Sequence, residues 1–242
     1  LVGSEMCIRD SDYIDLDMFE CLIGCAVEKD ADISGCFYRK IGSNYVDELG
    51  SDYTVKVFDS DEYLCEYYRK NVLYFSCCNK IYRRELVGDT RFSPEAGLCE
   101  DGCFNYEVSK KAKTVVMLNK PMYNYILRDT SLTNNKKSLS GWLGSITSNY
   151  EILLKEKDNK ILCTPIAVSF IDGLLNAVAQ YIKMGCTNNK EYKEIIKILR
   201  DNLKMLTAFP IGKKRKIRLY CAGYLTHLYQ IVMKAYFIRK QR

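Results

Sequence analysis

The chain has 242 residues and a mass of 28.0 kDa, which is enough for one large domain or two small ones. Apolar residues make up 48% and charged residues 27%, a composition typical of globular proteins that excludes disordered, collagen-like and coiled-coil chains. Twelve cysteines are scattered without a CxxC pair, and there is one histidine. We therefore expect free thiols in a reducing compartment and no zinc site.

Charge is distributed unevenly along the chain. Residues 1–62 contain fifteen Asp or Glu and five Lys or Arg, a net charge of −10, whereas residues 211–242 contain nine Lys or Arg and no acid, a net charge of +9. A basic segment of this kind can bind anionic lipid, nucleic acid or an acidic protein surface. No nucleic-acid-binding motif accompanies the charge, so we expect no nucleic-acid partner.

The first half of the sequence predicts a mixed α/β fold. Residues 1–11 have neither a helical nor an alternating period; they resemble a translated sequencing adaptor, and we treat them as a non-native leader. The hydrophobic periods that follow predict helices and strands in alternation. The helices are expected at 17–29, 59–70 and 101–111, and the strands at 32–38, 53–58, 72–82, 113–118 and 121–127.

Strand signals stop after residue 135. Three or four helices are expected beyond it, at 137–157, 163–184, 189–207 and 214–239. The stretch 161–182 is long enough to cross a bilayer, but Asp172 at its centre favours a helix of a globular fold. We expect three segments, namely the leader at 1–11, an α/β portion at 12–135 and an all-α region at 136–242.

Asp10 and Asp12 form the first group of residues that could carry chemistry. Two carboxylates one residue apart at the end of a strand can bind a divalent cation, because Mg²⁺ and Mn²⁺ prefer oxygen ligands and share them with phosphate groups. The alternative is a solvated acidic turn.

Glu100 and Asp101 form the second group, at the start of the helix expected at 101–111. A helix N-terminus favours negative charge, so the pair can simply cap the helix. The same position suits a base that takes a proton from a hydroxyl group. In the third group, Arg128 follows a predicted strand and could bind a diphosphate through its guanidinium group, or lie on the surface of a turn.

Four segments in this order resemble the bacterial family 2 glycosyltransferases of the GT-A fold. That family typically has a DSDDYID-type segment, an NKLYRRELL-type strand, an RFPEG…EDxxF segment and an AKKVVYLDEPLYYYRxRxxSIT-type hairpin. The counterparts here are DSDYIDLDMFE from residue 10, NKIYRREL at 79–86, RFSPEAGLCEDGCF at 91–104 and AKTVVMLNKPMYNYILRDTSLTN at 112–134. The resemblance covers residues 12–134 and implies a partial GT-A mixed sheet followed by the helical region.

The resemblance implies an inverting glycosyltransferase that builds cell-surface polysaccharide, such as capsule or lipopolysaccharide. It implies a nucleotide-sugar donor and a glycan or lipid-linked acceptor. On the matching positions, Asp101 is the base that deprotonates the acceptor hydroxyl, and Glu100 is its neighbour. The resemblance also implies Mg²⁺ or Mn²⁺ held by Asp10 and Asp12.

The same resemblance implies further substrate-binding residues. Arg128 and Ser131 match positions near the donor phosphates, and Asn79 and Lys80 match a strand beside the cleft for donor and acceptor.

Two features depart from the family pattern. Family members begin with a nucleotide-binding βαβ half that has no counterpart here, so we expect an N-terminally truncated chain that keeps the base and the acceptor side. In an ungapped alignment on Tyr13-Ile14-Asp15, Arg9 and Ser11 occupy the two metal-ligand positions of the motif.

The final helix, expected at 214–239, begins within the basic run KKRKIR at 213–218. Its apolar residues recur at a spacing of three to four, so it can lie in a membrane interface with its basic residues on anionic head groups, or pack on the domain. We expect a cytoplasmic protein that can be peripheral at the inner face of the cell membrane. The alternative to an enzyme is a non-catalytic, membrane-associated helical interaction module with a relict α/β half.

Overall fold

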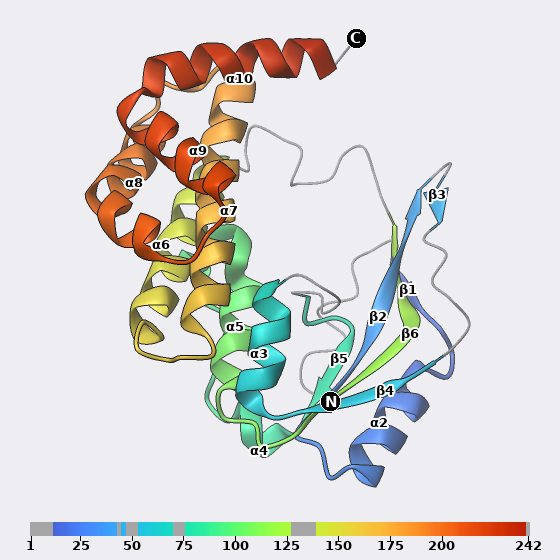
Figure 1. Cartoon of the computed structure of the whole chain (residues 1–242). Coiled ribbons are helices and arrows are strands. Elements are labelled where there is room, and N and C mark those ends of the chain that lie inside the picture. Colours follow the sequence, from blue (N-terminus) through green and yellow to red (C-terminus); the bar gives the residue numbers. More distant parts are fainter. Residues whose placement is uncertain (1–11, 43–44, 47–52, 70–75, 127–138, 241–242) are drawn as a thin grey trace. The chain divides into compact units, whose positions relative to one another are not determined.

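The structure is a computed structural model that describes residues 12–42, 45–46, 53–69, 76–126 and 139–240. The chain divides into two compact units (Figure 1). The first comprises Leu1–Ser93 and Glu100–Ser131, and the second comprises Pro94–Cys99 and Leu132–Arg242. The sequence did not predict that a short segment near residue 95 belongs to the helical unit.

The first unit is a mixed sheet with helices. Its described strands are β1 (Tyr13–Ile14), β2 (Ile33–Gly42), β3 (Tyr45–Val46), β4 (Val55–Phe58), β5 (Lys80–Tyr82) and β6 (Val115–Ile126). Its described helices are α2 (Met18–Glu28), α3 (Ser60–Arg69), α4 (Arg84–Val87) and α5 (Glu100–Ser109). The sheet and the helical region that follows it confirm the α/β fold expected from the sequence.

The parallel pair of β2 and β6 forms the centre of the sheet (Figure 1). Strands β3 and β5 pair antiparallel with β2, and β1 and β4 pair antiparallel with β6. The sequence predicted two strands, at 113–118 and 121–127, where the structure has the single strand β6. The ladder passes Pro121, which lacks an N–H donor, by shifting register on both sides of its partner Phe37.

Helix α2 packs on the sheet through its apolar face. Met18 and Leu22 are fully buried against Cys36 of β2 and against Val116 and Tyr123 of β6. The thiol of Cys36 is therefore surrounded by the core, and burial raises its pKa to about 12 from an ordinary value of 9.0.

Alkaline pH should weaken the fold through Cys36. A buried thiol with a raised pKa contributes stability that is complete below pH 9.0 and is lost as the pH rises towards its folded pKa. From about pH 8 to about pH 10, we expect the free energy of unfolding to fall by about 1.4 kcal/mol more in the wild type than in Cys36→Ala. Urea unfolding of both proteins at each pH measures this difference, and equal slopes would contradict the assignment.

The second unit is all helical in its described part. Its elements are the 3₁₀ helix η1 (Pro94–Cys99) and the helices α6 (Leu139–Lys155), α7 (Cys163–Lys183), α8 (Lys190–Ala208), α9 (Lys213–Tyr224) and α10 (Thr226–Lys240). Within the described residues, α7 is the one helix long and apolar enough to cross a membrane. However, 67% of its most apolar window is buried, and Asp172 on it makes a two-fold ion pair with Arg215 of α9, at 2.9 and 3.0 Å. The burial of α7 and its ion pair with α9 are typical of a core helix in a globular fold.

The single helix predicted at 214–239 is wrong, because the structure contains two helices that meet at Leu225. The carbonyl of Gly223 accepts hydrogen bonds from Nε of Arg200 (2.7 Å) and from the hydroxyl of Thr226 (3.0 Å). These bonds divert the carbonyl from the helical ladder, and Leu225 leaves the helical conformation at φ −103° and ψ 40°.

Glycines hold η1 on helix α6. A Cβ atom on Gly144 would lie 2.4 Å from the carbonyl oxygen of Glu95, and one on Gly97 would lie 2.3 Å from that of Gly141. Gly97 also has φ +60°, a conformation that other residues rarely adopt. The hydroxyl of Ser145 donates to the carbonyl of Ala96 at 3.2 Å, so the seam combines close backbone contact with a hydrogen bond.

Two helical glycines should respond oppositely to the same substitution. Gly144→Ala forces backbone apart in the η1–α6 seam and should lower the free energy of unfolding by about 1–3 kcal/mol. Gly173→Ala, on α7, meets open space and should raise it by up to about 1 kcal/mol through helix propensity. Denaturant titration compares the two variants, and equal stabilities would refute the close approach in the seam.

Candidate active site

Asp101 lies in the first turn of α5 and is half-buried, whereas its neighbour Glu100 is exposed. Its Oδ2 atom accepts a hydrogen bond from the backbone N–H of Cys77 at 3.2 Å. The thiol of Cys77 donates in turn to the backbone carbonyl of Asp101 at 3.7 Å. The carboxylate therefore combines a helix N-terminus, which favours its negative charge, with a fixed backbone donor that orients it.

Residues 76–80 form a turn, here called the 76–80 turn, that leads into β5. Four side-chain hydrogen bonds hold it in place. The amide of Asn79 donates to the carbonyl of Cys36 on β2, and the ammonium of Lys80 donates to the carbonyl of Ser76 (2.6 Å) and to Oδ1 of Asn79 (2.8 Å). The amide of Asn105 on α5 donates to the sulfur of Cys77 at 3.3 Å.

Asn79 and Lys80 are almost fully buried, and these contacts point into the protein. Burial lowers the pKa of Lys80, and nearby Cys77, Cys78, Cys36 and Asp101 act in the opposite direction. The structure thus gives both residues a part in holding the turn against Asp101; their expected contact with substrate stays a prediction.

Loss of Asn79 should destabilise the fold through Lys80. Asn79→Ala removes an acceptor from a buried ammonium and should lower the free energy of unfolding by about 2–4 kcal/mol. Lys80→Met removes the charge that needs the acceptor. The double variant should therefore be more stable than the sum of the two single effects by at least about 1 kcal/mol. Urea unfolding of the four proteins measures this coupling, and strict additivity would contradict it.

Asp12, which immediately precedes β1, makes hydrogen bonds to strand β6. Its Oδ2 atom accepts from the hydroxyl of Tyr123 (2.8 Å), and its Oδ1 atom accepts from the N–H of Ile126 (3.0 Å). Burial raises the pKa of Tyr123, so its hydroxyl stays protonated and donates to Asp12, and Cys78 packs against the core cluster that contains Tyr123. Asp12 therefore ties β1 to β6 and connects, through Tyr123, to the cluster that the 76–80 turn packs against.

A divalent cation does not fit this arrangement as the described residues have it. Both carboxylate oxygens of Asp12 already accept hydrogen bonds from β6. Among the described residues, no group of three or more His, Cys, Asp or Glu side chains converges to hold a metal ion. Asp10 lies outside the described residues, so the expected Asp10–Asp12 metal site stays a prediction, and no chemical step is derived through it. Arg128 and Ser131 also lie outside the described residues.

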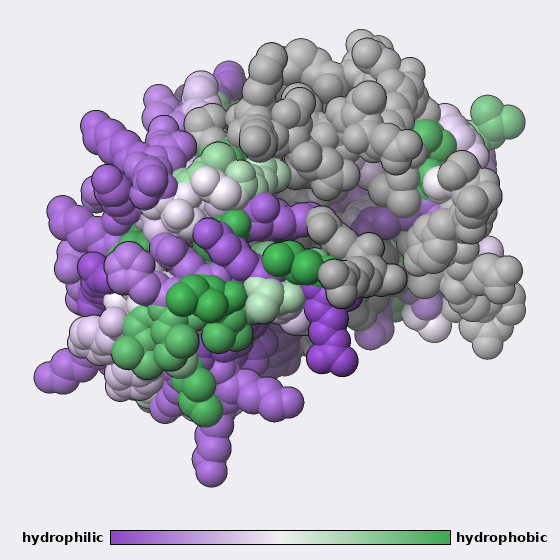
Figure 2. All heavy atoms as spheres, turned by 90° about the horizontal axis from the view of Figure 1, so that it is seen from above, coloured by the Kyte–Doolittle hydropathy of each residue, from purple (hydrophilic) through white to green (hydrophobic). Residues whose placement is uncertain are grey.

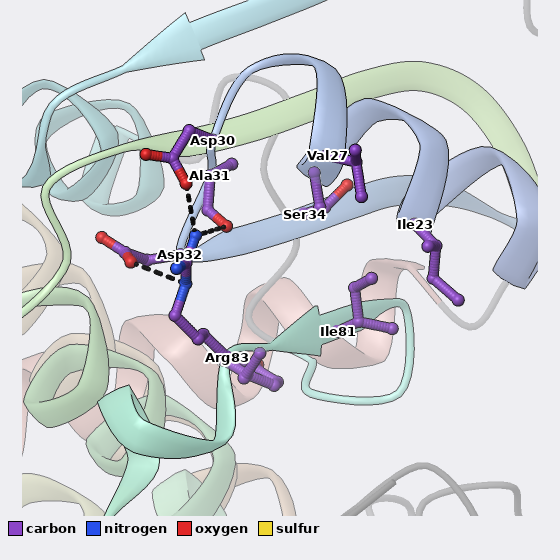
Figure 3. A pocket seen from close by; sticks show the side chains of 10 residues that line it. Ile23, Val27, Asp30, Ala31, Asp32, Ser34, Ile81 and Arg83 are labelled. Atoms are coloured by element: carbon purple, nitrogen blue, oxygen red, sulfur yellow. Dashed lines mark hydrogen bonds and ion pairs between the residues drawn. The ribbon is translucent and has the colours of Figure 1, made fainter.

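A cavity of about 390 Å³ opens beside this region, between α2, β2 and β5 (Figure 3). Arg83 forms one end, where it pairs with Asp30 (2.8 Å) and Asp32 (3.2 Å). Apolar side chains of α2 and β5 line the remainder, and the hydroxyl of Ser34 is buried with no hydrogen-bond partner among the described residues. None of the residues predicted from the sequence lines this cavity.

Sequence reasoning missed the residues that bring the motifs together. Cys77 in the 76–80 turn, Tyr123 on β6 and Asn105 on α5 have no chemical signature of their own. One signal was available: Cys77 and Tyr123 lie within or next to two of the four segments that resemble the glycosyltransferases, so their proximity in space could have been suspected.

The fold is similar to that of a solved structure. The chain resembles the crystal structure of S. aureus TarS 1–349 in complex with UDP-GlcNAc, with a TM-score of 0.54 over 96% of this chain and 66% of that one. Sequence identity in that comparison is 15%, so it establishes the fold alone.

The sequence itself is also related to a glycosyltransferase. It is 32% identical over 134 residues to the glycosyltransferase GlyA of Streptococcus pneumoniae serotype 4. The match covers 52% of this chain and 19% of GlyA, so the chain spans about a fifth of the length of this curated relative. No protein-family model matches the chain.

Proposed function

We propose that this chain belongs to a family 2 glycosyltransferase of the GT-A type that transfers a sugar from a nucleotide-sugar donor with inversion. One observation carries the proposal. The carboxylate of Asp101, at the N-terminus of α5, is oriented by the N–H of Cys77 at 3.2 Å in a chain related to a glycosyltransferase. A fixed, half-buried carboxylate is the group that general-base catalysis on a hydroxyl requires.

In the proposed reaction, Asp101 accepts the proton of the acceptor hydroxyl while that oxygen attacks the anomeric carbon of the donor sugar. The new C–O bond forms as the bond between the anomeric carbon and the diphosphate breaks, and the nucleoside diphosphate leaves with the electron pair. Glu100 is more exposed than Asp101 and places a second negative charge beside the base. Under this proposal Arg128 and Ser131 approach the donor phosphates.

We propose UDP-GlcNAc as the first donor to test, because the structurally similar TarS is in complex with it. The proposed acceptor is a glycan or lipid-linked hydroxyl in cell-surface polysaccharide synthesis, with the enzyme in the cytoplasm. Mg²⁺ or Mn²⁺ is implied by the family resemblance alone, and assays should include both ions.

Asp101→Asn should abolish most of the transfer. The asparagine oxygen still accepts the N–H of Cys77, so the fold is kept, but the amide cannot take a proton. We expect kcat to fall by about 10²–10⁴-fold. The assay follows release of UDP from UDP-GlcNAc, using protein expressed from the gene together with whatever sequence the genome places before residue 12.

Glu100→Gln serves as the matched control, because it removes the same charge one residue away from the proposed base. We expect it to reduce kcat less than tenfold. Unchanged turnover in Asp101→Asn would show that the base is another residue. Absence of sugar transfer from every donor tested would favour the non-catalytic interaction module.

A further inference from the structure

Helix α10 carries its apolar residues on the side that faces away from the helical unit. Leu228, Ile231, Val232 and Tyr236 are each more than half exposed. At 100° per residue they span an arc of about 140°. A helix of a globular protein normally buries its apolar arc, whereas α10 exposes it to solvent.

The opposite side of α10 makes the contacts with the unit. Tyr229 is buried, and the amide of Gln230 donates to the hydroxyl of Tyr192 on α8 at 3.1 Å. Thr226 is held by Arg200 at 3.0 Å. The helix is therefore anchored in its present rotation, and its exposed arc does not result from a missing contact with α7 or α8.

Exposed apolar residues also occur on α9 and at its C-terminal end. Ile217, Tyr220, Tyr224 and Leu225 are also exposed, and the rings of Tyr220 and Tyr224 stack with their centroids 6.2 Å apart. Figure 2, a view from above Figure 1, shows apolar side chains gathered among long hydrophilic ones on the helical unit. Exposed apolar area of this extent marks an interaction surface.

Basic residues lie on and around this surface. The exposed cations are Lys213, Lys214, Arg218, Lys234 and Arg239. Residues 211–242 contain no acid, and within the part of the chain that the structure describes Arg215 pairs with an acid elsewhere, Asp172. The apolar arc thus lies in a segment of strongly positive net charge.

The charge decides between possible occupants. A second copy docked face to face would bring two segments of +9 together, which is strongly unfavourable. Nucleic acid would match the charge but would leave the apolar arc in water. An anionic bilayer matches both, because its hydrocarbon boundary accepts the aliphatic side chains and its head groups pair with Lys and Arg. Tyrosine rings, present here at 220, 224 and 236, are favoured at this interface.

We infer that the exposed face of α9 and α10 is a membrane-docking surface that lies in the interface of an anionic bilayer, with the apolar arc of α10 inserted and the basic residues on lipid head groups. This surface belongs to the helical unit by itself. The inference therefore does not depend on the proposed sugar transfer, and an inactive chain can still bind.

Co-sedimentation of the 242-residue chain with vesicles tests the inference. We expect binding to vesicles that contain phosphatidylglycerol and little binding to phosphatidylcholine alone. Raising the salt from about 0.1 M to about 1 M shortens the Debye length from about 10 Å to about 3 Å and should release most of the protein.

Charge and apolar variants separate the two contributions. Lys213→Gln/Lys214→Gln/Arg218→Gln should weaken the partition coefficient about 100-fold, at about fivefold for each charge. The matched control removes three exposed charges from α8, in Lys193→Gln/Lys197→Gln/Lys204→Gln, and should weaken it less than tenfold.

The apolar variant is Leu228→Gln/Ile231→Gln/Val232→Gln, which keeps helix propensity and should weaken partition at least tenfold. Its control, Leu154→Gln/Ile161→Gln, replaces exposed apolar residues elsewhere in the unit and should leave binding unchanged. Circular dichroism confirms that each variant is folded.

Three results would overturn the inference. The first is failure of the wild-type chain to bind anionic vesicles. The second is binding that the α10 variant leaves unchanged. The third is a dimer in analytical ultracentrifugation that the α10 variant dissociates, without vesicle binding by either protein, since a second copy would then occupy the face.

Discussion

The 76–80 turn is the constraint on which the first unit depends. The backbone N–H of Cys77 donates to Asp101, Cys78 packs against the core cluster that contains Tyr123, and the side chain of Asn79 donates to the backbone of β2. Elements from three separate parts of the sequence are thereby joined by a few residues. The buried ammonium of Lys80 restricts which residues the turn can contain, because a desolvated charge destabilises the fold when it loses a hydrogen-bond acceptor.

This constraint gives the proposed chemistry its physical basis. A surface carboxylate at a helix start is ordinary, since capping alone explains it. Asp101 differs because a backbone donor from another element fixes its direction, and because the donor is itself held by buried hydrogen bonds. Preorganisation of this kind lets a base act without the cost of reorienting in the reaction.

The helical unit follows a different principle. Its core is built around α7, and its seam with η1 relies on glycines, where backbones approach more closely than side chains would permit. Its last two helices keep a large apolar and basic surface in solvent. Core packing therefore accounts for the apolar residues of α6 to α8. The exposed apolar arc of α10 is accounted for by the membrane contact that we infer.

The sequence by itself determined the mixed α/β character of the first half, the change to an all-α region and the resemblance to glycosyltransferases, because hydrophobic period and local motifs depend on neighbouring residues. Tertiary structure decided the rest. Two predicted strands form the single strand β6, because a shift in register lets the ladder pass Pro121. One predicted helix is divided at Leu225, because Arg200 and Thr226 donate hydrogen bonds to the carbonyl of Gly223. Tertiary structure also decided that Cys77 orients Asp101 and that α10 turns its apolar arc outward. Such outcomes depend on partners far away in the sequence, which no local pattern encodes.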